Sequence, residues 1–257
     1  MKPRACVLRT DGTNCDQETA FALELAGAQA EYLHVNELRS GHKRLLDYQI
    51  MVIPGGFSYG DDVLSGKILA VELTSLLREQ LQEFVDRGRL LLGICNGFQV
   101  LVRTGLLPYS RVGSITTTLM HNDSGHFECR WVSLKVEKGP CVFTQSLAGR
   151  TVTYQVAHGE GKFFTRQDIL DDLERQGLVV FRYVDAEGRP TQAYPANPNG
   201  SLHAVAGICD PSGRIMGLMP HPERFILPTQ HPNWRRMLMA PEGLPIFLDA
   251  VNYARQI

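Results

Sequence analysis

The chain has 257 residues, of which 44% are hydrophobic, and this is enough to bury the core of a folded globular protein. Its 26 basic and 27 acidic side chains leave a formal net charge of −1, so the charge balance favours neither nucleic acid nor a membrane surface as a partner. No apolar run reaches the roughly 18 residues of a membrane-spanning helix, and the N-terminal sequence turns polar too early for a signal peptide, so we expect a cytoplasmic protein.

The first half of the chain alternates between strand and helix patterns. Apolar runs predict strands at 5–10, 30–35, 48–53 and 90–92, and helical spacing predicts helices at 17–27 and 72–87. Strands that alternate with helices form parallel sheets through right-handed crossovers. We therefore expect an α/β fold with a mostly parallel central sheet flanked by helices.

The second half has a different pattern. Residues 126–137 alternate like an antiparallel strand, residues 178–190 predict a strand and a turn, and residues 203–220 predict a hairpin around 210–213. The tail 242–257 is amphipathic and predicts a closing helix. No linker or repeat separates the halves, so we expect one domain over residues 1–257, with antiparallel additions in its second half.

Six cysteines lie along the chain, and none forms a C-x-x-C pair. In a chain of this length without a signal peptide, we expect free thiols rather than disulfides. No cysteine–histidine cluster has the spacing of zinc ligands, so we expect no metal site. Cys15, in the sequence GTNCD, is interpreted as a structural cysteine.

The segment LLLGICNGFQVL (90–101) carries the strongest chemical signal. Its first residues are typical of a buried strand, and its later apolar residues recur at helical spacing. Gly93 and Gly97 flank Cys95 where the strand must turn into the helix, and glycine tolerates strained backbone and close packing. A sharp turn that presents one nucleophile at this point is the nucleophile elbow of many hydrolases. The pattern predicts that Cys95 is a catalytic nucleophile.

A cysteine nucleophile needs a base, which is usually a histidine oriented by a carboxylate. Two histidines have a carboxylate two residues later: His158 with Glu160, and His221 with Glu223. Prolines on both sides of His221 stiffen the backbone and favour an extended segment, in which alternate residues lie on one side. This favours His221 as the base and leaves His158, between flexible glycine-containing turns, as the alternative.

The motifs PGG, GICNGFQ and PHPER, in that order, resemble the class I (triad) glutamine amidotransferases. GTNCD, PGGFSYGDD, HGEG, NPNGS and GLMPHPER extend the match over nearly the whole chain, to the glutaminase subunits of this family that serve purine biosynthesis. Members carry cysteine, histidine and glutamate on an α/β sheet and hydrolyse glutamine to glutamate and ammonia. The resemblance implies that Cys95 is the nucleophile, His221 the base and Glu223 its orienting group.

The resemblance also implies substrate contacts. Gly56 or Phe57, together with Asn96, would donate backbone N–H groups to the oxyanion, and Gln99 would contact the substrate glutamine. The segments 39–46 and 229–239 are longer than the family pattern predicts.

The resemblance further implies a partner, because the chain has no P-loop or other ATP-binding signature. A separate ATP-dependent synthetase subunit would use ATP and Mg²⁺ to convert formylglycinamide ribonucleotide to the amidine, and a small third subunit would join the complex. No cofactor is expected in this chain.

Two other interpretations remain open. A peptidase-like cysteine hydrolase of the same elbow architecture would not need Gln99 or the PHPER segment. A scaffolding subunit with a decayed site would not need Cys95, His221 and Glu223.

Overall fold

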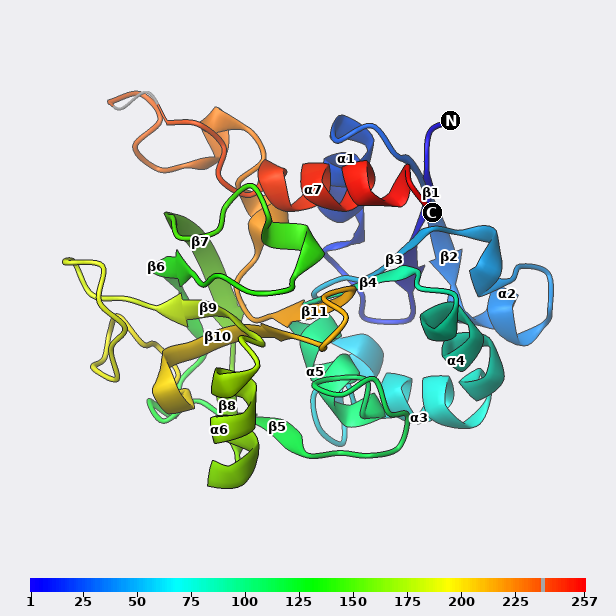
Figure 1. Ribbon diagram of the computed structural model, residues 1–257, viewed down its shortest axis with the longest axis horizontal. Coiled ribbons are helices and arrows are strands. Elements are labelled where there is room, and N and C mark those ends of the chain that lie inside the picture. Colours follow the sequence, from blue (N-terminus) through cyan, green and yellow to red (C-terminus); the bar gives the residue numbers. More distant parts are fainter. Residues whose placement is uncertain (237–238) are drawn as a thin grey trace.

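A nine-stranded sheet lies at the centre of the computed structural model, which describes residues 1–236 and 239–257 (Figure 1). The strand order is β2-β1-β3-β4-β11-β10-β9-β6-β7. Pairings from β2 to β11 are parallel, and those from β11 to β7 are antiparallel. The strands are β1 (Arg4–Arg9), β2 (Gln29–His34), β3 (Ile50–Ile53), β4 (Leu90–Ile94), β6 (Glu128–Val136), β7 (Thr151–His158), β9 (Val179–Tyr183), β10 (Val205–Cys209) and β11 (Ile215–Leu218).

Helices cover both faces of the sheet. Figure 1 shows α1 and α7 above the sheet and α3, α4 and α5 below it. Among the residues described, no helix is both long and apolar enough to cross a membrane. The helices are α1 (Asp16–Leu25), α2 (Val35–Arg39), α3 (Lys67–Ser75), α4 (Arg78–Asp86), α5 (Asn96–Thr104), α6 (Gln167–Arg175) and α7 (Leu244–Ala254).

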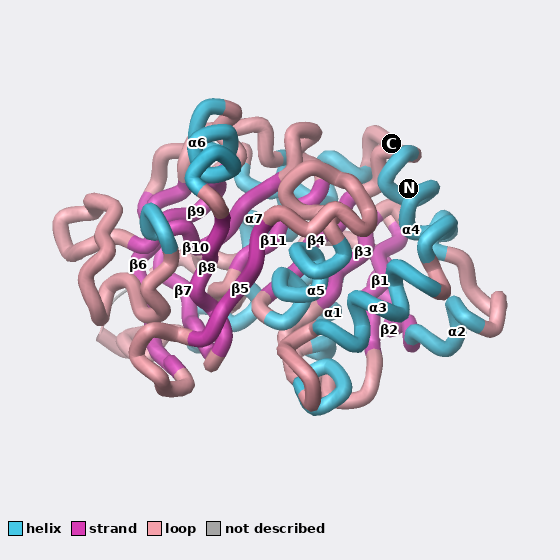
Figure 2. The backbone as a smooth tube through the Cα atoms, turned by 90° about the horizontal axis from the view of Figure 1, so that it is seen from below, coloured by secondary structure: helices cyan, strands magenta, loops and turns pink. Residues whose placement is uncertain are grey.

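A separate two-stranded ribbon lies beside α5. Its strands, β5 (Thr117–His121) and β8 (Glu160–Thr165), pair antiparallel. Figure 2 shows the ribbon from below, on the same face of the molecule as α3 and α5. This places the start of β8 close to the N-terminal end of α5.

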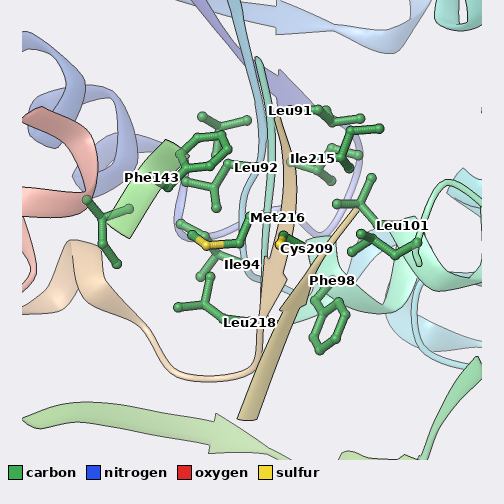
Figure 3. Packing of buried hydrophobic residues seen from close by; sticks show 14 of the residues in the cluster. Leu91, Leu92, Ile94, Phe98, Leu101, Phe143, Cys209, Ile215, Met216 and Leu218 are labelled. Carbon is green, nitrogen blue, oxygen red and sulfur yellow. The ribbon is translucent and has the colours of Figure 1, made fainter. Parts of the chain in front are cut away.

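The neighbouring strands β4 and β11 are buried on both faces. Because strand side chains alternate, Leu91 and Ile215 face Leu101 of α5, whereas Leu92 and Met216 face the opposite side (Figure 3). Burial on both sides explains why β4 has a continuous apolar run rather than an alternating one.

Glycines let α5 pack directly on the sheet. A Cβ at Gly97 would lie 1.9 Å from the carbonyl oxygen of Ile53, and one at Gly217 would lie 2.1 Å from Cδ2 of Phe98. A Cβ at Gly93 would lie 2.6 Å from the Gly97 carbonyl oxygen. Close backbone approach therefore requires glycine at 93 and 97, and the Phe98 ring requires it at 217. This packing fixes the N-terminus of α5 at the carboxyl ends of β3 and β4.

The predicted fold class is confirmed, but the single helix predicted at 72–87 is wrong. The segment forms α3 and α4, separated at Leu77, which has φ −117° and ψ 14°. The chain bends there because α3 packs along α5 whereas α4 packs on the turn at Leu45–Asp47. Leu77 is buried in the bend, so the apolar spacing continues through it and hides the break.

The described residues of the two long segments have little regular structure. Residues 39–46 run from the end of α2 into the 3₁₀ turn at Leu45–Asp47. The second segment begins within the 3₁₀ turn at Pro228–Gln230, and residues 231–236 continue as a bend and turns. Residues 237 and 238 of the second segment lie outside the described residues.

Candidate active site

Cys95 occupies the turn between β4 and α5 in a strained backbone conformation. Its φ of 52° and ψ of −104° are rare for a residue with a side chain. Its N–H donates to the carbonyl oxygen of Leu218 at 2.8 Å, and its own carbonyl accepts from the N–H of Gln99 at 3.1 Å. The side chain is 4% exposed, and Sγ donates to the carbonyl oxygen of Ala157 at 3.6 Å. The sharp turn expected from the two glycines is present.

His221 and Glu223 form a buried pair directly after β11. His221 Nδ1 donates to Oε1 of Glu223 at 2.6 Å, and the two side chains are 1% and 0% exposed. The backbone N–H of His221 also donates to the carbonyl oxygen of Gln155 on β7 at 2.8 Å. Because β11 runs parallel to β4, the pair follows a strand that lies beside the one carrying Cys95.

The backbone behind this pair differs from the expected extended segment. His221 is extended, with φ −106° and ψ 90°, but Pro222–Arg224 forms a 3₁₀ turn. Glu223 therefore reaches the imidazole because the chain curls back, not because alternate residues share one side of a strand. The extended segment predicted from the two prolines is therefore wrong at Glu223.

Charges around His221 favour its protonated form. Burial by itself would lower the pKa of His221, but the negative charges of Glu223 and of the Cys95 thiolate outweigh burial and hold that pKa well above its ordinary value. Nε2 of His221 has no hydrogen-bond partner among the described residues. A thiol that turns from Ala157 toward this nitrogen could give up its proton there, and such bonds often tighten only when substrate is bound.

His158 does not have the arrangement of a base with its carboxylate. Its Nδ1 donates to Oδ1 of Asn122 at 3.1 Å, whereas Glu160 lies toward Arg103, with 3.6 Å between Oε2 and Nη2. Burial, together with the positive charge of His221, lowers the pKa of His158 to about 3. The structure thus brings His221 and Glu223 together and separates His158 from Glu160.

The backbone donors expected for an oxyanion differ in availability. The N–H of Phe57 donates to the carbonyl oxygen of Gly12 at 2.9 Å, so it is already engaged. Among the described residues, no acceptor is bound by the N–H of Gly56 or Asn96. Gly56 has φ 145°, and a Cβ there would lie 2.8 Å from the backbone nitrogen of Asn14. Gly56 is therefore the better candidate of the first two.

The side chains of Asn96 and Gln99 join the helix to two loops. Asn96 Nδ2 donates to Oδ1 of Asp61 at 3.2 Å and to Oε1 of Gln99 at 3.0 Å, and Gln99 Nε2 donates to the carbonyl oxygen of Glu160 at 2.6 Å. Both ends of the Gln99 amide are thus engaged by protein, and its contact with substrate stays a prediction. The contact of Asp61 with Asn96 gives no sequence signal, because no local pattern marks a carboxylate that binds a residue distant in the chain.

Asn122 was also missed. Its Oδ1 accepts from the N–H of Gly161 at 3.0 Å as well as from His158, and its Nδ2 donates to the carbonyl oxygen of His158 at 2.8 Å. One buried amide therefore fixes both the ring and the backbone of the turn after β7. A single asparagine in a loop gives no sequence signal for this role.

Cys15 is the third side chain that sequence reasoning left out of the site. Cys15, His221 and Glu223 each bring one possible metal-binding atom within 4.8 Å of the others. These groups bind protein, however: Nη2 of Arg224 donates to Sγ of Cys15 at 3.2 Å, and His221 binds Glu223. Mutual contacts explain the cluster better than a metal does, and the lack of a metal stays a prediction.

Comparison with known proteins identifies the family. The CobB/CobQ-like glutamine amidotransferase domain matches residues 2–254. Phosphoribosylformylglycinamidine synthase subunit PurQ of Dehalococcoides mccartyi is 48% identical, with 100% of this chain and 99% of the relative covered. The chain is a glutamine amidotransferase of the PurQ family. The PurQ subunit of Methanococcus maripaludis is 43% identical, with 98% of this chain and 99% of the relative covered.

A solved structure agrees with this assignment. A chain of PurLQS from Thermotoga maritima matches the amidotransferase with a TM-score of 0.75 and 34% identity, covering 98% of this chain and 99% of that one. The resemblance inferred from GICNGFQ and PHPER is confirmed.

The neutral state of His158 predicts a pH-dependent stability. The ordinary pKa of histidine is about 6.5, so between about pH 6.5 and pH 3 the unfolded chain binds a proton at His158 that the folded chain does not bind. The free energy of unfolding should therefore fall on acidification, by up to about 1.4 kcal/mol per pH unit from this residue. Urea unfolding of the wild type and of His158→Gln at several pH values measures the difference in slope.

The matched control is His42→Gln, because His42 is exposed. This variant should keep the wild-type slope. A His158→Gln protein that loses stability on acidification as steeply as the wild type would show that His158 is not held neutral.

Proposed function

We propose that residues 1–257 form a single cytoplasmic glutaminase domain that hydrolyses glutamine through Cys95, His221 and Glu223. The observation that carries this proposal is the buried 2.6 Å contact between His221 and Glu223. It lies after a strand parallel to the one that ends at the strained Cys95 turn. No other histidine–carboxylate pair that the sequence suggested has this geometry.

The geometry supports an acyl-transfer mechanism. The Cys95 thiolate attacks the side-chain carbonyl carbon of glutamine, and the N–H groups of Gly56 and Asn96 stabilise the resulting oxyanion. The C–N bond then breaks as His221 passes its proton to the departing ammonia, which leaves a glutamyl thioester on sulfur. Water, deprotonated by His221, hydrolyses the thioester to glutamate and frees the thiol.

The product requires a partner. Ammonia released into water is protonated and loses its nucleophilicity, so it must pass to a second active site. The relatives are named as subunits of phosphoribosylformylglycinamidine synthase, and the similar solved chain belongs to an assembly described as PurLQS. In our proposal an ATP-dependent synthetase subunit uses ATP, Mg²⁺ and this ammonia to convert formylglycinamide ribonucleotide to the amidine. A small third subunit completes the complex, and this chain holds no cofactor.

Two half-exposed aromatic rings mark the surface where we place the synthetase. Phe57 and Phe127 are 44% and 51% exposed and stack with 6.3 Å between ring centroids. Phe57 begins the loop 57–62, and Phe127 lies against Gly159 in the turn after β7. A partner that covers both rings would remove apolar surface from water. It would also contact the two loops to which the side chains of Asn96 and Gln99 are hydrogen-bonded.

A peptidase is a poorer fit to this site. A peptidase must admit a polypeptide to its nucleophile, whereas Cys95 is 4% exposed and His221 is 1% exposed.

Replacing the nucleophile should separate the two half-reactions. Cys95→Ser should lower glutamine hydrolysis by several orders of magnitude because a serine hydroxyl does not ionise readily near neutral pH. The complex with synthetase should still form the amidine when ammonium chloride supplies the nitrogen. Glutamate release and amidine formation are measured in parallel, and full glutaminase activity in the variant would remove Cys95 from the mechanism.

Loss of the proposed base should reduce activity more than loss of its orienting carboxylate. His221→Ala should reduce kcat by about 10⁶-fold and Glu223→Ala by about 10⁴-fold, the scale seen for the corresponding members of a serine triad. The comparison variant is His158→Ala, which should lose less activity than either. A His158→Ala enzyme as inactive as His221→Ala, with no loss in Glu223→Ala, would mean that the base is the other histidine.

Docking of the synthetase should activate the glutaminase. An N–H group stabilises an oxyanion only when it points to where the charge develops, and docking against the loop 57–62 would fix the direction of the Gly56 N–H. Glutamine hydrolysis should therefore rise at least about 10-fold when synthetase and its nucleotide are added. Asp62→Lys, on the exposed loop, should weaken this stimulation, whereas Glu24→Lys on α1, across the sheet, should not. A free subunit as active as the complex would contradict the prediction.

A further inference from the structure

Cys15 lies against the imidazole of His221 although it is far from it in sequence. A Cβ at Gly55 would lie 3.1 Å from Sγ of Cys15 and 2.7 Å from Cε1 of His221, so thiol and imidazole pack on the same side of Gly55. Cys15 is 1% exposed, and its sulfur lies within 4.8 Å of the nearest donor atoms of His221 and Glu223. The thiol is therefore part of the wall that surrounds the His221–Glu223 pair.

Two hydrogen bonds orient the sulfur. Its S–H donates to Oδ1 of Asn14 at 3.2 Å, and Sγ accepts from Nη2 of Arg224 at 3.2 Å. A thiol has one proton, so the bond to Asn14 leaves its lone pairs for Arg224 and for the imidazole. A cysteine that only filled space in the core would not need this arrangement.

The backbone of Cys15 is tied to the proposed oxyanion turn. Its N–H donates to the carbonyl oxygen of Gly55 at 3.2 Å. Its carbonyl accepts from the N–H and the hydroxyl of Thr19, at 3.3 and 2.6 Å, which anchors the residue at the start of α1. One residue thus connects a helix, the turn that contains Gly56, and the imidazole.

The charged and titratable groups around His221 are Glu223, Cys95, Cys15, Arg224 and His158. The negative charges of Glu223 and Cys95 favour the imidazolium, and the sulfur of Cys15 adds to this effect. The positive charge of Arg224 opposes it, and the hydrogen bond to Cys15 fixes where that guanidinium lies. The uncharged His158 adds no positive charge near neutral pH. Removing the thiol would take away one acceptor and leave the guanidinium without this partner.

We infer that Cys15 is a positioning residue for glutamine hydrolysis, which holds the imidazole of His221 against Glu223 and fixes the Gly55–Gly56 turn. This inference rests on the proposed function, since it assigns Cys15 to the same site. It replaces the interpretation of the GTNCD cysteine as merely structural.

The test compares Cys15→Ala, Cys15→Ser and Cys6→Ala in the complex with synthetase. Cys6 is a fully buried thiol in β1 and controls for loss of packing. Cys15→Ala should lower kcat about 10-fold with little change in KM, on the scale of one lost oriented hydrogen bond. It should also move the alkaline limb of the kcat profile to lower pH, because the imidazolium that protonates ammonia loses a stabilising neighbour. Cys15→Ser should recover most of both effects, and Cys6→Ala should change stability alone.

A second readout does not depend on glutamine. In a Cys129→Ser background, which removes the exposed thiol, the rate of Cys95 alkylation by iodoacetamide is followed against pH by mass spectrometry. Loss of Cys15 should shift the alkaline step of this profile to lower pH. If the wild-type complex released no glutamate, the proposed function would fail while alkylation still tested Cys15. A Cys15→Ala protein with the wild-type kcat, pH profile and alkylation profile would show that the thiol only fills space.

Discussion

The direct packing of α5 on the sheet is the constraint on which the site depends. Cys95 is the single residue between the end of β4 and the start of α5, so the chain must turn within it, at φ 52° and ψ −104°. That conformation costs about 1–3 kcal/mol and persists only where the surroundings hold it. The surroundings here are the carbonyl of Leu218 on β11 and the close approach of Gly97 to Ile53. The same packing that strains the backbone places the sulfur at the carboxyl edge of the sheet.

The sheet topology places His221, the proposed base, after the strand next to β4. The last parallel pairing joins β4 to β11, and His221 follows β11 by a few residues. Beyond β11 the sheet becomes antiparallel, and this brings β7 to the far edge, where Gln155 binds the backbone of His221 and Ala157 accepts from Cys95. The antiparallel half is thus more than an addition to a parallel core. Its strand β7 contacts both Cys95 and His221.

Because the site is buried, neighbouring charges control the pKa values of its histidines. The imidazole, the carboxylate and the thiol are at most 4% exposed, so each charge must be balanced by a neighbour rather than by water. The charge of Glu223 and that of a Cys95 thiolate outweigh burial and raise the pKa of His221, whereas burial and the positive charge of His221 lower the pKa of His158 to about 3. The pKa values of two buried histidines in one site are therefore shifted in opposite directions.

The sequence by itself determined the fold class, the elbow at Cys95 and the preferred histidine, because each rests on local chemistry: burial patterns, glycine flanking and proline restriction. Only the tertiary structure decided how Glu223 reaches the imidazole, which backbone N–H groups are free, and that Asp61, Asn122 and Cys15 lie against Asn96, His158 and His221. Those contacts join residues distant in sequence, through backbone geometry and buried hydrogen bonds that leave no periodic pattern. The break between α3 and α4 was not predicted from the sequence for a related reason, since the neighbours that bend the chain lie elsewhere in the fold.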